Sequence, residues 1–216
     1  MSLAWQGPSD AGPKFRRVCS GVTLLWPTCV KGCANVYVME TGRLRLRRLT
    51  MDDLDHLLLI FSDPVAMQYY PSTMDRAEAA AWIRRTDANY EAYGTGFLAV
   101  ESREDGRFLG QCGLIPQTID ASVDMEVAYL FVRRFWGQGY ATEAARACRD
   151  WGFEHLGVSR LVSIISKYNT PSMKVAQRNG MAIVSETVKS GGIPHWVYAI
   201  SREDWLERGT GLQREP

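Results

Sequence analysis

Apolar and polar residues recur along this chain with two periods, one typical of strands and the other typical of helices. Alternation of the two kinds predicts strands at 43–49, 97–101, 108–115, 123–132 and 160–165. Apolar residues at three- and four-residue spacing predict helices at 52–63, 75–90, 142–155 and 172–178. A closing hairpin at 183–188 and 196–200 is expected to lead into a last short helix from Ser201.

Local signals mark where these elements begin and end. Asp75 with Glu78 three residues later forms a capping signature for the second helix. Pro64 ends the first helix because the residue before a proline avoids helical geometry. Pro116 is expected in a loop between the third and fourth strands. The succession of strands, a strand–turn–helix–strand–helix unit and a hairpin predicts one α/β domain with a mixed sheet.

The turn between the fourth predicted strand and the next helix carries the most chemical information. Gly137 and Gly139 stand there two positions apart, so the backbone can turn tightly and a ligand can lie against it. The first amide groups of the following helix have no partner inside the helix, and they carry the positive end of its dipole. This arrangement favours a bound phosphate or pyrophosphate.

Two common phosphate-binding motifs do not fit this turn. A Walker loop needs a Lys-Ser or Lys-Thr pair after the glycines, and none follows. A dinucleotide fingerprint needs glycine or alanine where Thr142 stands, and an acid roughly 20 residues further on. Because the segment 157–162 supplies no acid, a nucleotide-binding regulator is disfavoured.

The motif Arg134-x-x-Gly137-x-Gly139 resembles the coenzyme A signature of the GNAT acyltransferases. Three further segments resemble, in the family's order, its third strand, its fourth strand and its fourth helix with the turn behind it: 110–114, 126–130 and 169–181. The form of residues 139–144 and the opening 40–47 are most similar to the RimJ/RimL branch, which acetylates protein N-termini and related amines.

The resemblance covers about residues 39–208 and implies a fold. This fold is α/β (α+β), with a central mixed, mostly antiparallel sheet that is flanked by helices and splayed between the fourth and fifth strands. Residues 1–38 are then expected to be an irregular or disordered N-terminal extension, and residues 209–216 a C-terminal tail.

Composition limits the classes of partner. The chain has 216 residues, 46% of them hydrophobic, which is enough for one full core. A net charge of +1 gives no argument for nucleic acid or an anionic membrane, and no apolar run approaches the roughly 20 residues of a membrane helix. A cluster of arginines is interpreted as the solvent face of an edge strand: Arg43, Arg45, Arg47 and Arg48.

The five cysteines are not expected to form a metal site or a disulfide framework. Cys112 and Cys148 lie in apolar strand and helix contexts, which favours core packing. Cys19, Cys29 and Cys33 fall in the N-terminal extension without a nearby histidine. No metal is therefore expected, and a reducing cytoplasm is the simplest setting.

Glu126 is the candidate general base. It lies in the middle of the fourth predicted strand, where a carboxylate is costly to bury unless it is paired or lines a wet cleft. The resemblance implies a catalytic Glu at this position, which would take a proton from an attacking amine. The alternative is a structural Glu that pairs with an arginine or lies at a solvated strand edge.

The resemblance also implies a set of coenzyme contacts. The backbone of Leu130, Phe131 and Val132 would pair with the pantetheine arm, and an amide near Leu130 would stabilise the developing oxyanion. Arg134 is a candidate phosphate ligand, with a solvated loop arginine as the alternative. The pyrophosphate would rest on the amides of Gly137, Gln138, Gly139, Tyr140, Ala141 and Thr142. Glu143, in the first helical turn, is expected to be structural.

Two residues near the fourth helix complete the expected chemistry. The resemblance implies that Ser172 donates a proton to the leaving thiolate, with a helix N-cap as the alternative. It implies that Asn169 contacts the coenzyme, with a plain turn residue as the alternative. Four residues are candidates for contacts with the acceptor: Tyr69, Tyr70, His195 and Trp196.

These residues predict an acetyl-CoA-dependent N-acetyltransferase that acts on a primary amine, either a protein N-terminus or a small molecule, by direct attack. One alternative is a non-catalytic acyl-CoA sensor or interaction module. Another is the same chemistry with a different donor, such as succinyl-CoA. A homodimer is compatible with the resemblance.

Overall fold

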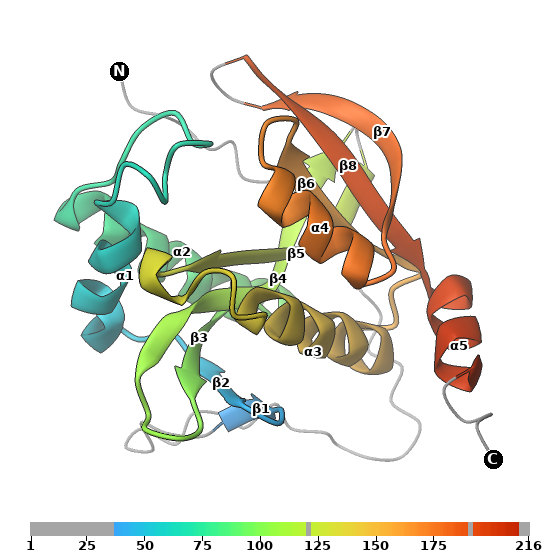
Figure 1. Cartoon of the computed structure of the whole chain (residues 1–216), viewed down its shortest axis with the longest axis horizontal. Helices are drawn as coiled ribbons and strands as arrows, with labels where there is room; N and C mark the ends of the chain where they lie inside the picture. Colours follow the sequence, from blue (N-terminus) through green and yellow to red (C-terminus); the bar gives the residue numbers. More distant parts are fainter. Residues whose placement is uncertain (1–36, 120–121, 190–191, 212–216) are drawn as a thin grey trace.

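The computed structural model describes residues 37–119, 122–189 and 192–211, which form one eight-stranded sheet with helices on both faces (Figure 1). The strands are β1 (Tyr37–Glu40), β2 (Leu44–Arg48), β3 (Phe97–Ser102), β4 (Phe108–Ile119), β5 (Ser122–Phe131), β6 (Arg160–Ser166), β7 (Ala182–Lys189) and β8 (Ile193–Ser201). The α-helices are α1 (Leu54–Phe61), α2 (Arg76–Tyr93), α3 (Tyr140–His155), α4 (Thr170–Arg178) and α5 (Arg202–Gly211).

The sheet order is β1-β2-β3-β4-β5-β6-β8-β7, and the neighbours are antiparallel except for β5 and β6. This mixed, mostly antiparallel sheet confirms the expected fold class. A parallel pair needs a crossover connection, and α3 supplies it between β5 and β6 (Figure 1).

The helices are divided between the two faces of the sheet. The indole of Trp82 on α2 donates to the side chain of Gln111 on β4, at 3.1 Å. The next residue, Cys112, lies 3.5 Å from Cys148 of α3, measured between the sulfurs. Because successive side chains of a strand point to opposite faces, α2 and α3 cover opposite sides of β4. Both cysteines are buried, as expected.

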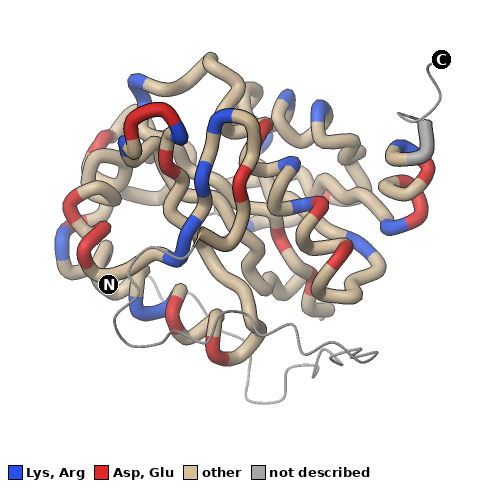
Figure 2. The backbone as a smooth tube through the Cα atoms, turned by 90° about the horizontal axis from the view of Figure 1, so that it is seen from below, with Lys and Arg blue, Asp and Glu red and all other residues tan. Residues whose placement is uncertain are grey.

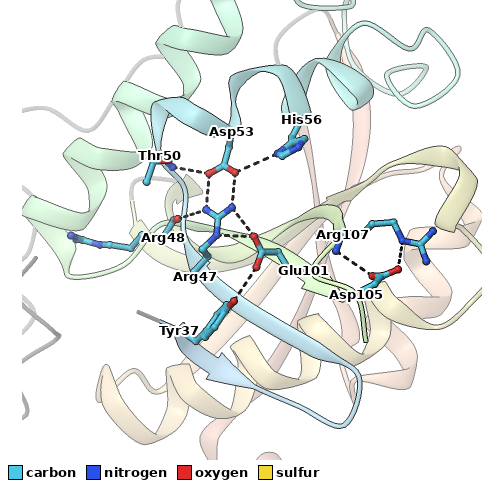
Figure 3. A network of polar contacts seen from close by, with 9 residues as sticks. All are labelled: Tyr37, Arg47, Arg48, Thr50, Asp53, His56, Glu101, Asp105 and Arg107. Carbon is cyan, nitrogen blue, oxygen red and sulfur yellow. Dashed lines mark hydrogen bonds and ion pairs between the residues drawn. The ribbon is translucent and has the colours of Figure 1, made fainter. Parts of the chain in front are cut away.

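The arginine cluster does not lie on an edge strand, which corrects the sequence interpretation. β1 covers β2 on its outer side, so that β2 is an inner strand (Figure 1). The Arg47 guanidinium, 12% exposed as a side chain, pairs with Asp53 at 2.8 Å and with Glu101 at 2.7 Å. The Tyr37 hydroxyl of β1 donates to Glu101 at 3.4 Å, so this buried network joins β1, β2, β3 and the start of α1 (Figure 3).

The sequence signals at element ends have mixed outcomes. The Asp75–Glu78 capping box is confirmed: Asp75 accepts from the Glu78 amide at 2.8 Å. Pro116 does not begin a loop, because β4 continues through it to Ile119. β3 pairs with β4 only as far as Gly113, so Pro116 has a ladder partner on one side alone and its missing N–H is tolerated.

The ends of the described chain differ slightly from the expected boundaries. β1 begins at Tyr37, two residues before residue 39, and α5 continues past residue 208 to Gly211. Cys19, Cys29 and Cys33 lie outside the described residues. Within those residues, none of the helices combines the length and apolarity needed to cross a bilayer. Acidic and basic residues are interspersed along the backbone (Figure 2), in agreement with the net charge of +1.

Candidate active site

β5 and β6 separate in the middle of the sheet, and side chains hold them apart. The two strands are paired only at Met125 with Leu161 and at Glu126 with Val162. Beyond this point the Ile164 amide donates to Oε1 of Glu126 at 3.0 Å, and the Ser163 hydroxyl donates to the Val127 carbonyl at 2.7 Å. Side chains thus satisfy backbone groups that would otherwise continue the ladder, and Glu126 lies at the point of separation.

A cavity of about 870 Å³ starts from this separation and extends to the glycine turn. Thirteen of the seventeen predicted site residues line this cavity. Eleven of them lie on or beside β5, the glycine turn, α3, α4 and β8: Glu126, Leu130, Phe131, Gly137, Gly139, Tyr140, Ala141, Thr142, Asn169, Ser172 and His195. Tyr69 and Tyr70 line it as well. One continuous cleft therefore joins the candidate base to the candidate phosphate site.

The glycine turn is open towards the cleft. Gly137 and Gly139 have φ angles of +77° and +81°, in the left-handed region that favours glycine, and α3 begins directly after them. Both glycines are exposed. The hydroxyl oxygen of Thr142, in the first turn of α3, is buried and has no hydrogen-bond partner within the described chain. The turn therefore presents amides and one unpartnered hydroxyl beside an open space.

Arg43 and Glu143 brace this turn from behind, a role that the sequence analysis missed for Arg43. Glu143 accepts hydrogen bonds from the Thr41 hydroxyl at 2.6 Å and from the Arg43 amide at 3.0 Å, and it pairs with the Arg43 guanidinium at 2.7 Å. Arg43 also donates to the Gln138 carbonyl at 3.0 Å. The structural role expected for Glu143 is thus confirmed, and its partners are supplied by the β1–β2 turn, which is distant in sequence.

The surroundings of Glu126 raise the pKa of its carboxyl group above the ordinary value. The residue is 7% exposed, and burial raises its pKa above the ordinary value. Three smaller effects oppose this rise: the positive charge of Lys189, the hydrogen bond from the Ile164 amide and a hydrogen bond with Gln117. Lys189 itself donates to Gln117 at 2.9 Å, so the closing hairpin contributes directly to the surroundings of the carboxyl group.

Two tyrosines share this environment. Tyr70 is 37% exposed, but desolvation of its hydroxyl on the cleft side raises its pKa, and the negative charge of Glu126 raises it further. Burial raises the pKa of Tyr129 as well, and its hydroxyl donates to the Ser172 carbonyl at 3.0 Å across the separation of the strands. Sequence reasoning missed Tyr129, because an aromatic residue within an apolar strand is typical of core packing.

Asn169 is the N-cap residue of α4. Its side chain accepts from the Ser172 amide at 3.2 Å, so Asn169 and not Ser172 is the N-cap. Ser172 lies within the first turn and lines the cleft, and Thr170 and Pro171 lie between the two. The N-cap alternative considered for Ser172 is therefore wrong, and Asn169 is more than a plain turn residue.

Four predicted site residues do not line the cleft. The Val132 amide donates to the Leu109 carbonyl at 3.0 Å and is not available to a ligand. Arg134 stacks over Phe135, and Gln138 turns its side chain back to the Arg134 carbonyl at 3.2 Å. Trp196 follows His195 and so faces the opposite side of β8, where Lys167 covers its ring.

The register of β4 and β5 indicates which of the amides near Leu130 face the cleft. The Val132 amide is hydrogen-bonded to the Leu109 carbonyl of β4, and Leu130, two positions earlier, lies opposite Gln111 in the same register. Along an antiparallel strand, successive amides point alternately towards and away from the neighbouring strand, so residues two positions apart point their amides the same way. Because the Leu130 amide therefore faces β4, it does not face the cleft. The amides of Tyr129 and Phe131 face the side where β6 has separated.

The closing hairpin supplies one wall. Nδ1 of His195 donates to the Ile193 carbonyl at 2.7 Å, and burial lowers the pKa of the His195 imidazole. α2 supplies another wall through one helical face: Trp82, Arg85, Thr86 and Asn89. The cleft thus has a glycine turn at one end and a mixed aromatic and polar chamber at the other.

A fold with this splayed sheet, glycine turn and buried carboxylate defines an acetyltransferase of the GNAT type. The chain belongs to that family: residues 43–182 match the model of the GNAT acetyltransferase domain. The Bacillus subtilis protein YkkB is 39% identical over 163 residues, which cover 74% of this chain and 93% of the relative.

Solved structures share the fold. An acetyltransferase from Agrobacterium tumefaciens is 30% identical, with a TM-score of 0.66 and coverage of 77% of this chain and 97% of that one. RimL, a ribosomal L7/L12 α-N-protein acetyltransferase solved in complex with coenzyme A, superposes with a TM-score of 0.64 at 15% identity, covering 77% of this chain and 98% of that one. At that identity, the likeness to RimL shows the fold alone.

Proposed function

We propose that this protein transfers an acetyl group from acetyl-CoA to a primary amine by direct attack of the amine on the thioester. The observation that carries the proposal is the continuous cleft from the open glycine turn to the buried Glu126. An activated acyl carrier needs a site for its diphosphate, and an ammonium acceptor needs a nearby base. Both are present in one cavity of about 870 Å³.

The coenzyme diphosphate binds at the amides of the turn and of the first turn of α3, where the helix dipole favours negative charge. The unpartnered Thr142 hydroxyl becomes satisfied when it donates to a phosphate oxygen. The pantetheine arm follows the open edge of β5, where the amides of Tyr129 and Phe131 face the cleft and those of Leu130 and Val132 face β4. Arg43 supports this site from behind, through the Gln138 carbonyl and the carboxylate of Glu143.

Glu126 takes the proton that the amine loses on attack. A positioned base of this kind typically contributes ~10²–10⁴-fold, and it works best when its pKa lies close to the operating pH. Burial moves the pKa of Glu126 in that direction. The Ile164 amide of β6 donates to the carboxylate of Glu126 where the two strands begin to separate, so this hydrogen bond fixes the position of the base at the end of the cleft.

The remaining steps use the backbone of β5 and the start of α4. As the nitrogen–carbon bond forms, the thioester oxygen gains negative charge, which the cleft-facing amide of Tyr129 or Phe131 stabilises. The carbon–sulfur bond then breaks, and the Ser172 hydroxyl passes a proton to the thiolate while its oxygen takes a proton from water in the open cleft, which returns the serine to its neutral form. The Tyr129 hydroxyl, which holds the Ser172 carbonyl at 3.0 Å, positions this serine. No covalent enzyme intermediate is required.

Calorimetric titration with acetyl-CoA, succinyl-CoA and NAD in parallel tests the first half of the proposal. Binding of the acyl-CoA compounds without binding of NAD is expected, because the site lacks the acid that a dinucleotide ribose needs. Free thiol release with a panel of amines then tests the second half. Binding of acetyl-CoA without amine-dependent thiol release would instead identify a coenzyme sensor.

A further inference from the structure

We infer that the acceptor amine carries a carboxylate on an apolar or aromatic body, and that Arg85 of α2 binds this carboxylate. The inference rests on the proposed function, because it assigns the acceptor of that same site. It concerns the part of the cleft that is bounded by α2, by the loop that contains Tyr69 and Tyr70, and by the closing hairpin.

Arg85 lies on the face of α2 that lines the cleft. Trp82, Arg85 and Asn89 are spaced three and four residues apart, so they point in one direction from the helix. The guanidinium of Arg85 lies over the Trp82 ring, 5.6 Å from its centroid. Trp82 in turn contacts Phe97 of β3, whose ring centroid is 5.1 Å away. The helix therefore presents a cation on an aromatic support to the same cavity that contains Glu126.

The positive charge of Arg85 has no acidic partner among the described residues. Although the residue is exposed overall, partial desolvation of its guanidinium lowers its pKa, the charge of Arg84 lowers it further, and no carboxylate raises it. By contrast, Arg43, Arg47 and Arg160 each pair with a carboxylate at 2.6–2.8 Å. An arginine that lines a cavity and lacks a partner is suited to a planar anion, because its guanidinium donates to a carboxylate through two parallel hydrogen bonds.

The charges of the cleft exclude polycationic acceptors. Glu126 is the single acidic residue among those that line it within the described chain, and this carboxylate is assigned to the reacting amine. Lys189 lies beside that carboxylate and adds a second positive charge on the acceptor side. A polyamine or an aminoglycoside would bring further ammonium groups against Arg85 and Lys189, without acids to receive them.

The apolar surface of the chamber fits the body of the acceptor. Tyr69, Tyr70, Trp82 and Phe97 line it together with Met74. Aromatic side chains contribute large contact areas and favour aromatic or aliphatic partners. The chamber thus offers a base for the amine, aromatic walls for the body, and Arg85, which has no acidic partner among the described residues, for an anionic end.

A matched series of acceptors tests the inference: phenylalanine, phenylalaninamide, phenethylamine and spermidine, together with leucine and leucinamide. Transfer is measured as thiol release from acetyl-CoA. We expect the two amino acids to exceed their amides in kcat/KM by about tenfold or more, the lower range for a hydrogen bond to a charged group. The amides lose the ammonium proton more readily, so reactivity alone would give the opposite order.

Variants of α2 test whether Arg85 causes the preference for amino acids over their amides. In Arg85→Gln, the kcat/KM values for each amino acid and its amide are expected to lie within about twofold of each other. Arg85→Lys keeps the positive charge and is expected to retain part of the preference for the amino acids. Arg84→Gln is the matched control, because Arg84 is the neighbouring arginine, is exposed as Arg85 is, and does not line the cleft. Coenzyme affinity, measured by calorimetry, is expected to be equal in all four proteins.

Three results would overturn the inference alone. If the unmodified enzyme acetylates the amino acids and their amides equally well, the acceptor needs no carboxylate, but the proposed acetyltransferase activity is unaffected. A preference for acids that survives Arg85→Gln would assign it to another residue. Transfer to spermidine above the amino acids would reverse the substrate class. If coenzyme binds and none of the amines accepts an acetyl group, the proposed function falls together with the inference.

Discussion

Replacement of Glu126 by glutamine separates the chemical role of this residue from its structural role. Gln retains an oxygen that accepts from the Ile164 amide, so the separation of β5 and β6 is preserved. It cannot take a proton from the amine at any ordinary pH. We therefore expect turnover to fall by ~10²–10⁴-fold, which corresponds to about 2.7–5.4 kcal/mol of transition-state stabilisation. Coenzyme binding is expected to change little, because the glycine turn lies at the other end of the cleft.

The effect on stability is expected to be small, because two contributions oppose each other. A hydrogen bond to a neutral oxygen is weaker than one to a carboxylate by about 1 kcal/mol. The variant also avoids the burial of a charge. The folded-state pKa of Glu126 is raised, so wild-type folding is favoured at low pH and this contribution is lost as the pH rises from the unfolded value of 4.5 through the folded pKa. The stability of Glu126→Gln relative to the wild type should therefore increase across that interval.

Three measurements together check this reasoning: thiol release, calorimetry with coenzyme A, and urea denaturation at several pH values. The low-pH limb of the rate profile, which reports ionisation of the base, should disappear in the variant. Unchanged amine acetylation by Glu126→Gln would refute the assignment of the base. Equal loss of coenzyme affinity and of turnover would show that the residue supports the cleft and takes no part in the chemistry.

Three further variants test the coenzyme site and the fold. Gly139→Val forces a β-branched residue to a φ of +81° and places its Cβ 3.4 Å from the Arg43 guanidinium. Calorimetry should therefore show weaker coenzyme binding, and equal affinity would contradict the phosphate assignment. Thr142→Ala removes an unpartnered hydroxyl, so coenzyme affinity should fall by about 2- to 10-fold while the urea midpoint stays the same. Asp53→Asn removes the bidentate carboxylate partner of Arg47, whose charge is still paired with Glu101, and should lower the free energy of unfolding in urea by about 1.5–3 kcal/mol. Because Arg47 and the Thr50 amide lower the pKa of Asp53, wild-type stability should fall as the pH drops below 3.8, and Asp53→Asn should lose this dependence.

Local patterns determined most of the elements of this protein. Alternation identified β2 to β6, and the capping signature at Asp75 fixed the start of α2, because both depend on neighbours within a few residues. The glycine turn and the carboxylate in β5 were recognisable for the same reason. Together with the resemblance to the GNAT family, they led to the fold class and to the type of reaction.

The tertiary structure decided which residues share a space and which backbone groups remain open. β1 made β2 an inner strand and converted Arg47 from a solvated side chain into a buried ion pair. Pairing with β4 turned the Leu130 amide away from the cleft, and the placement of α4 gave Tyr129 a partner in Ser172.

The reason for this division is physical. Periodicity along a strand or helix is encoded locally, whereas register, strand neighbours and the surroundings of a charge depend on segments far apart in the chain. Arg43 and Glu143 are 100 positions apart, and Gln117 and Lys189 are 72 apart. The sequence therefore determined the elements and the type of chemistry, and the three-dimensional packing alone decided how the turn is braced and what surrounds Glu126.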